Sequence, residues 1–180
     1  MRRPVLSLLL AAVLTVLLAV SGPGPAAAKP YPDHVSVKDK AGDAPARVDL
    51  LSGTYAISNG TARWSAKVEN LTETTFFAFE IWPLAAAWDR VAVYRENGET
   101  VGKVYFVDNE ESPTPYVREC PRLKVSWKFA KNRVSVQVPR HCLQASKSSG
   151  SAPYEFHTYS RIGGQKHGPR DALPAKTLDY

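Results

Sequence analysis

The sequence of 180 residues contains only two cysteines and four histidines, and neither set forms a familiar metal or redox motif. Cys120 and Cys142 are too far apart for a CxxC motif, and the histidines form no HxH, HxxxH or HExxH arrangement. A zinc ion would therefore need ligands assembled entirely by tertiary structure. The sequence thus excludes the zinc and thiol-redox classes that are identified by a local motif.

Catalytic motifs are absent as well. The chain has no GxSxG, SxxK or Cys-His signature, and its 17 carboxylates are too dispersed to suggest a glycosidase pair. It also lacks a nucleic-acid recognition motif, although its net charge is +6. We therefore expect a protein that is not an enzyme and that does not bind nucleic acid.

Long apolar runs are limited to one, at residues 5–20. It follows Arg2 and Arg3 and precedes three small residues at positions 26–28, which is the pattern of a cleavable export signal. The alternative is an uncleaved membrane anchor, but a bilayer span needs about 20 apolar residues and this run is shorter. We expect residues 1–28 to be a signal peptide and the remaining chain, 29–180, to be secreted without a membrane span.

Helical periodicity is nearly absent from residues 29–180, whereas period-two alternation is frequent. Ala62, Trp64, Ala66 and Val68 alternate with polar residues and follow the Asn-Gly pair at 59–60, which favours a tight hairpin turn. Similar runs, several of them bounded by turn residues, occur at residues 77–82, 90–95, 99–107 and 154–162. They predict one all-β domain, an antiparallel β-sandwich of the jelly-roll or immunoglobulin-like kind, with its core at about 36–162 and a less ordered tail at 163–180.

A second hairpin is predicted at residues 123–138. Pairing Phe129 with Val134 sets Trp127 opposite Val136 and places the large apolar groups on one side. Cys120 and Cys142 lie just outside the two strands, and an exported protein meets an oxidising environment. We therefore predict a Cys120–Cys142 disulfide that stabilises the fold by about 3 kcal/mol.

Three carboxylates near the start of the domain form a candidate calcium site. Asp39, Asp43 and Asp49 lie within a short segment that also contains Gly42. Ca²⁺ takes six to eight oxygen ligands, and three aspartates could supply part of that shell. The alternative is that these side chains hold backbone amides of the loop.

Aromatic residues away from the clearest core strands are candidate ligand contacts. Trp82, Trp88 and Tyr94 are the ones we select, because sugar rings stack on exposed aromatic side chains. The second hairpin also carries a basic face, which could contact an anionic cell-wall polymer or could simply keep the strand soluble.

Several short motifs occur in this chain in the same order as in a known group of proteins, which the chain therefore resembles. The motifs are Asp-x-x-Gly-Asp at 39–43, the alternating strand with Trp64, Cys-Pro-x-Leu-x-Val at 120–125 and Val-Pro-Arg-x-Cys-Leu at 138–143. The segment 36–143 resembles small secreted β-sandwich proteins of unknown function from actinobacteria. Those proteins are loosely similar to family 9 carbohydrate-binding modules and DOMON domains, so the resemblance implies a β-sandwich and names no catalytic residue.

Together these observations favour a secreted, non-catalytic binding module whose ligand is a glycan or a cell-envelope polymer. One alternative is a structural or protein-interaction module of the cell envelope, which would use a strand edge or the basic hairpin face. Another is a secreted hydrolase whose site is assembled only by tertiary structure.

Overall fold

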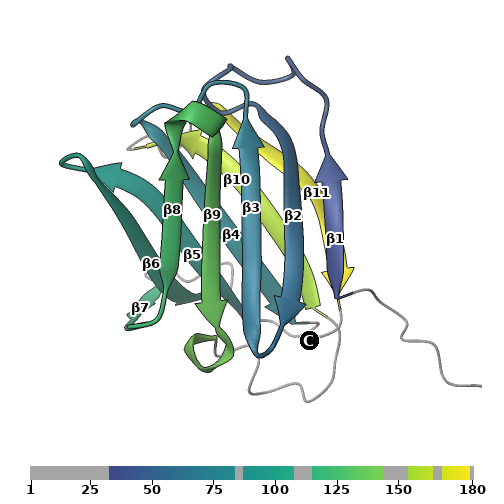
Figure 1. Ribbon diagram of the computed structural model, residues 1–180, viewed down its shortest axis with the longest axis vertical. Helices are drawn as coiled ribbons and strands as arrows, with labels where there is room; N and C mark the ends of the chain where they lie inside the picture. Colours follow the sequence, from purple (N-terminus) through teal and green to yellow (C-terminus); the bar gives the residue numbers. More distant parts are fainter. Residues whose placement is uncertain (1–32, 84–86, 108–114, 144–153, 164–167, 179–180) are drawn as a thin grey trace, which may run out of the picture.

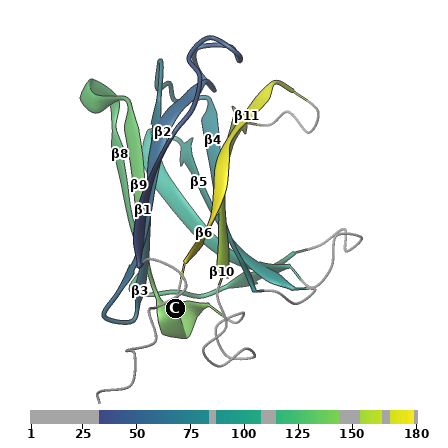
Figure 2. The same ribbon diagram turned by 90° about the vertical axis from the view of Figure 1, so that its right-hand side faces the viewer.

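The computed structural model describes residues 33–83, 87–107, 115–143, 154–163 and 168–178, and these form two antiparallel β-sheets packed face to face (Figures 1 and 2). The predicted signal peptide lies outside these ranges. In spatial order, the five-stranded sheet contains β1 (His34–Lys38), β2 (Leu50–Ser58), β3 (Thr61–Val68), β9 (Arg133–Pro139) and β8 (Lys124–Lys128). The six-stranded sheet contains β11 (Arg170–Leu178), β10 (Tyr154–Ile162), β4 (Thr75–Pro83), β5 (Trp88–Glu96), β6 (Glu99–Val107) and β7 (Tyr116–Arg118). The predicted antiparallel β-sandwich is confirmed.

Two tight turns follow directly from Asn-Gly pairs in the sequence. Asn59 and Gly60, between β2 and β3, have φ angles of 49° and 65°. Asn97 and Gly98, between β5 and β6, have φ angles of 52° and 80°. Positive φ at both central residues matches the twist of the flanking strands, and Asn and Gly adopt it most readily. Both Asn-Gly pairs therefore form tight hairpin turns, and the turn expected at residues 59–60 is confirmed.

The core lies between the sheets and is rich in aromatic rings. Trp64 of β3 is 2% exposed, and its ring centroid lies 5.3 Å from that of Phe156 and 6.3 Å from that of Phe79. Phe156 and Phe79 belong to the six-stranded sheet, so these contacts join the two layers. Alternation along each strand leaves the intervening residues on the outer faces.

The predicted register of the second hairpin is wrong by two residues. Trp127 of β8 pairs with Val134 of β9, not with Val136, because Phe129 leaves the strand and begins the short 3-10 helix η1 (Phe129–Lys131). Asn132 closes this turn in the left-handed region, with φ of 47°, and its N–H donates to the Phe129 carbonyl at 2.9 Å. Since side chains alternate with period two, the shift leaves Val125, Trp127, Val134 and Val136 on the inner side, whereas Phe129 is 42% exposed.

The predicted disulfide is present. Cys120 follows β7 of the six-stranded sheet, and Cys142 lies in the 3-10 helix η2 (Arg140–Cys142) after β9 of the five-stranded sheet. Their Cα atoms are 5.5 Å apart, and Cys142 is buried. The bond therefore ties down the connection by which the chain crosses from one sheet to the other.

The segment 163–180 was expected to be a less ordered tail, but it contributes an edge strand. Strand β11 pairs with β10, with a register shift between Phe156 and Thr158. Leu173 and Leu178 are buried in the core, while Pro174 is tolerated because an edge strand leaves one row of N–H groups unpaired. The register shift interrupts the alternation of apolar and polar residues along β11, so the sequence of this segment does not have the regular pattern of a strand.

The described residues contain no helix long and apolar enough to span a membrane.

Candidate functional site

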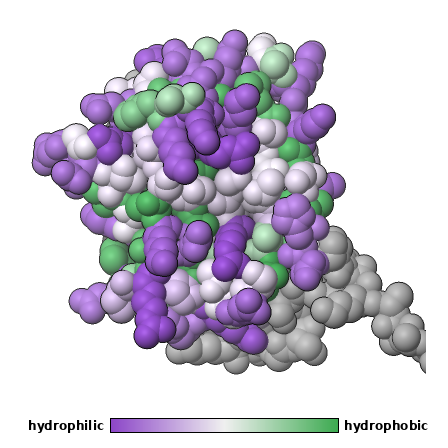
Figure 3. Space-filling view, viewed as in Figure 1, coloured by the Kyte–Doolittle hydropathy of each residue, from purple (hydrophilic) through white to green (hydrophobic). Residues whose placement is uncertain are grey.

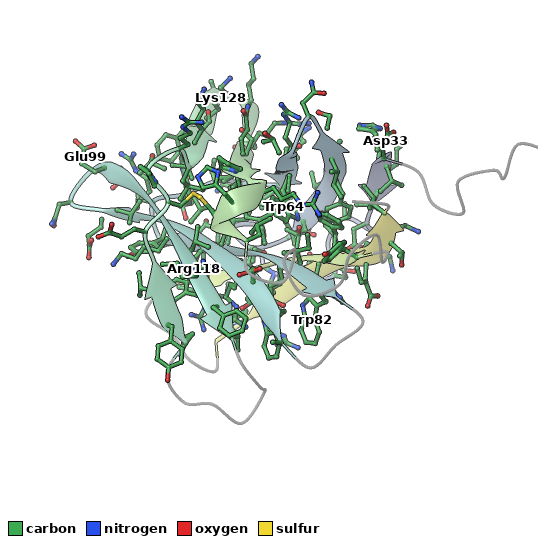
Figure 4. All side chains as sticks on the ribbon, turned by 90° about the horizontal axis from the view of Figure 1, so that it is seen from below. Asp33, Trp64, Trp82, Glu99, Arg118 and Lys128 are labelled. Carbon is green, nitrogen blue, oxygen red and sulfur yellow. A yellow bond between two sulfur atoms is a disulfide. The ribbon has the colours of Figure 1, made fainter. Side chains whose placement is uncertain are left out.

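The outer face of the six-stranded sheet carries aromatic and charged side chains in place of the usual small polar ones. Figure 4 shows Trp64 between the two sheets and Trp82 on the opposite side of the six-stranded sheet, pointing away from the core. The cross-strand register brings Glu80 of β4 beside Arg90 of β5 on one side and His157 of β10 on the other. We call this surface the aromatic face, and it comprises Phe76, Glu80, Trp82, Trp88, Arg90, Tyr94, Tyr105, His157, Tyr159 and Arg161.

A groove of about 460 Å³ lies at one end of the aromatic face, and we call it the tryptophan groove. The rings of Trp82 and Trp88 stack with centroids 4.3 Å apart and planes 8° apart. Trp88 is only 4% exposed, whereas Trp82 is half-buried and also contacts the ring of His157, with centroids 5.2 Å apart. Trp82 is therefore held between two rings and presents part of its surface to the groove.

A buried carboxylate fixes the orientation of the groove's side chains. Glu80 is 4% exposed although it lies on the outer face. Its Oε2 accepts a hydrogen bond from Trp82 Nε1 at 3.0 Å, and its Oε1 accepts one from Arg90 Nε at 2.5 Å. Both carboxylate oxygens are therefore occupied, and the carboxylate holds the indole and the guanidinium in place.

Arg90 and Tyr159 contribute polar groups to the lining of the groove. The Arg90 side chain is 29% exposed, and its guanidinium carbon lies 5.8 Å from the centre of the Tyr159 ring. Burial, together with the negative charge of Glu80, raises the pKa of Tyr159 above 10.0. The phenol therefore stays protonated at neutral pH and can donate or accept a hydrogen bond.

A second groove, of about 500 Å³, lies at the other end of the same face, and we call it the tyrosine groove. Its walls include Phe76 and Tyr94, whose rings stack with centroids 6.0 Å apart. The guanidinium of Arg161 lies 4.4 Å from the centre of the Phe76 ring, and Arg95 also lines the groove. The tyrosine groove therefore combines flat apolar rings with cationic groups.

The three aromatic residues selected from the sequence lie on this one face, but not in one groove. Trp82 and Trp88 line the tryptophan groove, while Tyr94 lines the tyrosine groove. Sequence reasoning did not identify Glu80 or Arg90. The available signal was that Glu80 shares a strand face with Trp82, because the two residues are two positions apart.

Two of the three aspartates selected from the sequence lie together. Oxygen atoms of Asp43, Asp49 and Asp171 lie within 4.8 Å of one another, and this is a group that could hold a metal ion. Asp39 is not a member of the group, and its Oδ1 accepts a hydrogen bond from the N–H of Lys40 at 2.8 Å. Asp171 comes from the segment that was expected to be a tail.

The outer face of the five-stranded sheet is different in chemistry, and Figure 3 shows that hydrophilic side chains dominate it. The strands of this sheet contain no Asp or Glu. Among the described residues, none of its outward cations forms an ion pair with a carboxylate. We call this surface the basic face, and its cations are Lys38, Arg63, Lys67, Lys124, Lys128 and Arg133.

Comparison with known proteins adds no functional information. Neither a protein family nor a curated protein matches the chain in sequence.

Proposed function

We propose that this protein is an exported, non-catalytic binding module that holds a glycan or another polymer of the cell envelope on its aromatic face. The observation that supports this most directly is the half-buried Trp82, stacked on Trp88 and placed beside Arg90 and Tyr159 in an open groove. The C–H face of a sugar ring packs on an indole, while hydroxyl groups of the sugar take hydrogen bonds from fixed polar side chains.

The position of the second groove favours an extended ligand. Phe76 in the tyrosine groove and Trp82 in the tryptophan groove lie on the same strand, β4. The two residues are six positions apart along the strand, which corresponds to about 20 Å at the usual rise of a β-strand. A polymer lying along β4 would contact rings at both ends, whereas a single sugar would occupy only one groove.

Export is part of the proposal and is supported by two independent features. Residues 1–28 have the order of a signal peptide, with two arginines, an apolar run and three alanines. The Cys120–Cys142 disulfide is a bond that persists in oxidising compartments. A module in that location would meet envelope polymers directly.

The test is co-sedimentation of the oxidised protein with purified cell walls and with a panel of insoluble polysaccharides. We expect saturable binding that survives high salt, since ring stacking is not screened by ions. Trp82→Ala should weaken binding by at least about tenfold, as expected for a central aromatic contact. The matched control is Tyr116→Ala, which removes a ring that is 68% exposed on β7 and outside both grooves.

Binding that is equal in Trp82→Ala and the parent protein would contradict the proposal, and so would no binding to any polysaccharide. Loss of binding in high salt would instead favour a second function, an interaction module that holds an anionic envelope polymer on the basic face. The observation in its favour is the set of six cations without a carboxylate in the same sheet. In that case a Lys124→Ala/Lys128→Ala double variant should lose binding while Trp82→Ala keeps it.

A further inference from the structure

The loop between β1 and β2 folds so that it brings two carboxylates together. Gly42 has φ of +84°, a backbone conformation that glycine adopts without strain. This places its N–H 2.6 Å from Asp49 Oδ2, to which it donates a hydrogen bond. The N–H groups of Val48 and Asp49 both donate to the Pro45 carbonyl, at 2.8 and 3.0 Å, and close the loop. Asp43 is thereby held next to Asp49.

The third carboxylate reaches this loop from the other sheet. Asp171 of β11 accepts hydrogen bonds from the N–H of Leu50 at 2.7 Å and from the N–H of Ala172 at 2.7 Å. Figures 1 and 2 show the loop between β1 and β2 at the same end of the sandwich as the start of β11. Asp43 and Asp49 therefore come from the loop between β1 and β2, Asp171 comes from the edge strand β11, and oxygen atoms of all three lie within 4.8 Å of one another.

Asp49 provides a second, independent indication of a ligand. Its side chain is 0% exposed, and its Oδ1 has no hydrogen-bond partner among the described residues. Leaving a buried charged oxygen without a donor is unfavourable, and native proteins rarely do so without an ion or a water at the position. Because Gly42 already occupies Oδ2, Oδ1 is the oxygen available to a cation.

No basic side chain neutralises this cluster. Among the described residues, no Lys, Arg or His lies within ion-pair distance of Asp43, Asp49 or Asp171. Three carboxylates therefore repel one another in a chain whose net charge is +6.

We propose that Asp43, Asp49 and Asp171 bind one Ca²⁺ ion that fastens the loop between β1 and β2 to strand β11. An all-oxygen set with three carboxylates fits Ca²⁺, which accepts six to eight oxygens and flexible geometry; water and backbone carbonyls complete the shell. Mg²⁺ is usually held by one or two carboxylates, and Zn²⁺ prefers nitrogen and sulfur ligands. The ion would join the two sheets at the end of the sandwich where Asp49 and Asp171 meet.

The experiment is calorimetric titration of the purified, oxidised protein with CaCl₂ and separately with MgCl₂, after removal of metals with a chelator. We expect one Ca²⁺ per chain, weaker binding of Mg²⁺, and a melting temperature that rises with Ca²⁺ concentration, because a ligand bound only to the folded state stabilises it. Asp43→Asn is the main variant, because this side chain is exposed and its neutralisation lowers the repulsion within the cluster, so the metal-free protein should stay folded with an equal or higher melting temperature.

Asp43→Asn should weaken Ca²⁺ binding by at least about tenfold, and so should Asp171→Asn, as expected when a charged ligand is removed. The matched control is Asp33→Asn, which removes an equal charge from an exposed position just before β1 and should bind like the parent protein. Asp39→Asn separates this group from the one suggested by the sequence, and we expect a smaller effect than that of Asp43→Asn. No Ca²⁺-dependent heat or melting shift in the parent protein would overturn the proposal, and so would equal weakening by Asp33→Asn and Asp43→Asn.

Discussion

The two outer faces of this sandwich are built on the same strand geometry but carry different chemistry. On the basic face the outward residues of the described strands are mostly serines, threonines, lysines and arginines, and none of them is Phe, Tyr or Trp. On the aromatic face the outward residues form two grooves lined by stacked rings. A solvated sheet face needs only polar residues to be stable and soluble, as the basic face demonstrates. The rings of the aromatic face are therefore not a requirement of the fold, and this supports a binding role for them.

The two faces also differ in how their charges are held. Lysines of the basic face, such as Lys67 and Lys128, are exposed and have no carboxylate within ion-pair distance among the described residues. On the aromatic face, Glu80 is nearly buried and joins Trp82 to Arg90. An ion pair sheltered in this way affects stability far more than an exposed charge does.

The largest difference between the faces should appear when one charge is removed from each. Glu80→Ala leaves Arg90 without its partner and Trp82 Nε1 without its acceptor, and we expect the free energy of unfolding to fall by about 3 kcal/mol. Lys67→Ala on the basic face should change it by less than about 0.5 kcal/mol. Urea unfolding followed by fluorescence measures both. Equal effects of the two variants would mean that the aromatic face is no better organised than the basic one.

The free energy of unfolding should depend on alkaline pH through two tyrosines, Tyr55 in the core and Tyr159 on the aromatic face. Burial raises the pKa of Tyr55 in the core to about 12, and burial with Glu80 raises that of Tyr159 above 10.0. Since the unfolded chain releases these protons first, stability is unaffected below about pH 10 and falls as the pH rises through the folded-state values. For Tyr55 the loss amounts to roughly 2–3 kcal/mol.

Unfolding by urea at a series of pH values, from about pH 9 to about pH 12, measures this slope. Tyr55→Phe should flatten the slope, and Tyr159→Phe should flatten it by a smaller amount. If Tyr159→Phe left the slope unchanged, the phenol of the aromatic face would be as accessible as an exposed one.

The smallest effect concerns the stacked cation of the tyrosine groove. Arg161→Ala removes the guanidinium that covers the Phe76 ring, and we expect a loss of about 1 kcal/mol in the free energy of unfolding. Lys128→Ala on the basic face, which removes an exposed cation, should be close to neutral. If Arg161→Ala left the free energy of unfolding unchanged, the stacking of Arg161 on Phe76 would contribute nothing to stability.

Local signals explain which parts of the fold could be predicted from the sequence. The turn at Asn59 and Gly60 and the strand containing Trp64 depend on neighbouring residues, so they were predictable. The register of β8 and β9 was not, because the 3-10 turn beginning at Phe129 moved the pairing by two residues. The disulfide was predictable because the chain offers a single pair of cysteines.

The candidate sites were predictable only in part, because their residues come together through strand pairing. Glu80 meets Arg90 only because β4 and β5 pair in one particular register. Asp171 reaches Asp49 from β11, and its hydrogen bond to Leu50 spans 121 residues of sequence. No local pattern indicates such contacts, whereas Trp82 could be selected from its residue type alone.

The central claim is that the aromatic face, and not the basic face, holds the ligand. A titration followed by backbone amide NMR tests it most directly, with a soluble oligosaccharide prepared from whichever polymer co-sediments with the protein. We predict that the shifted amides belong to β4, β5 and β10, with the largest changes near Trp82 and Arg90. Shifts concentrated on β8 and β9, or no shift at saturating oligosaccharide, would contradict the claim.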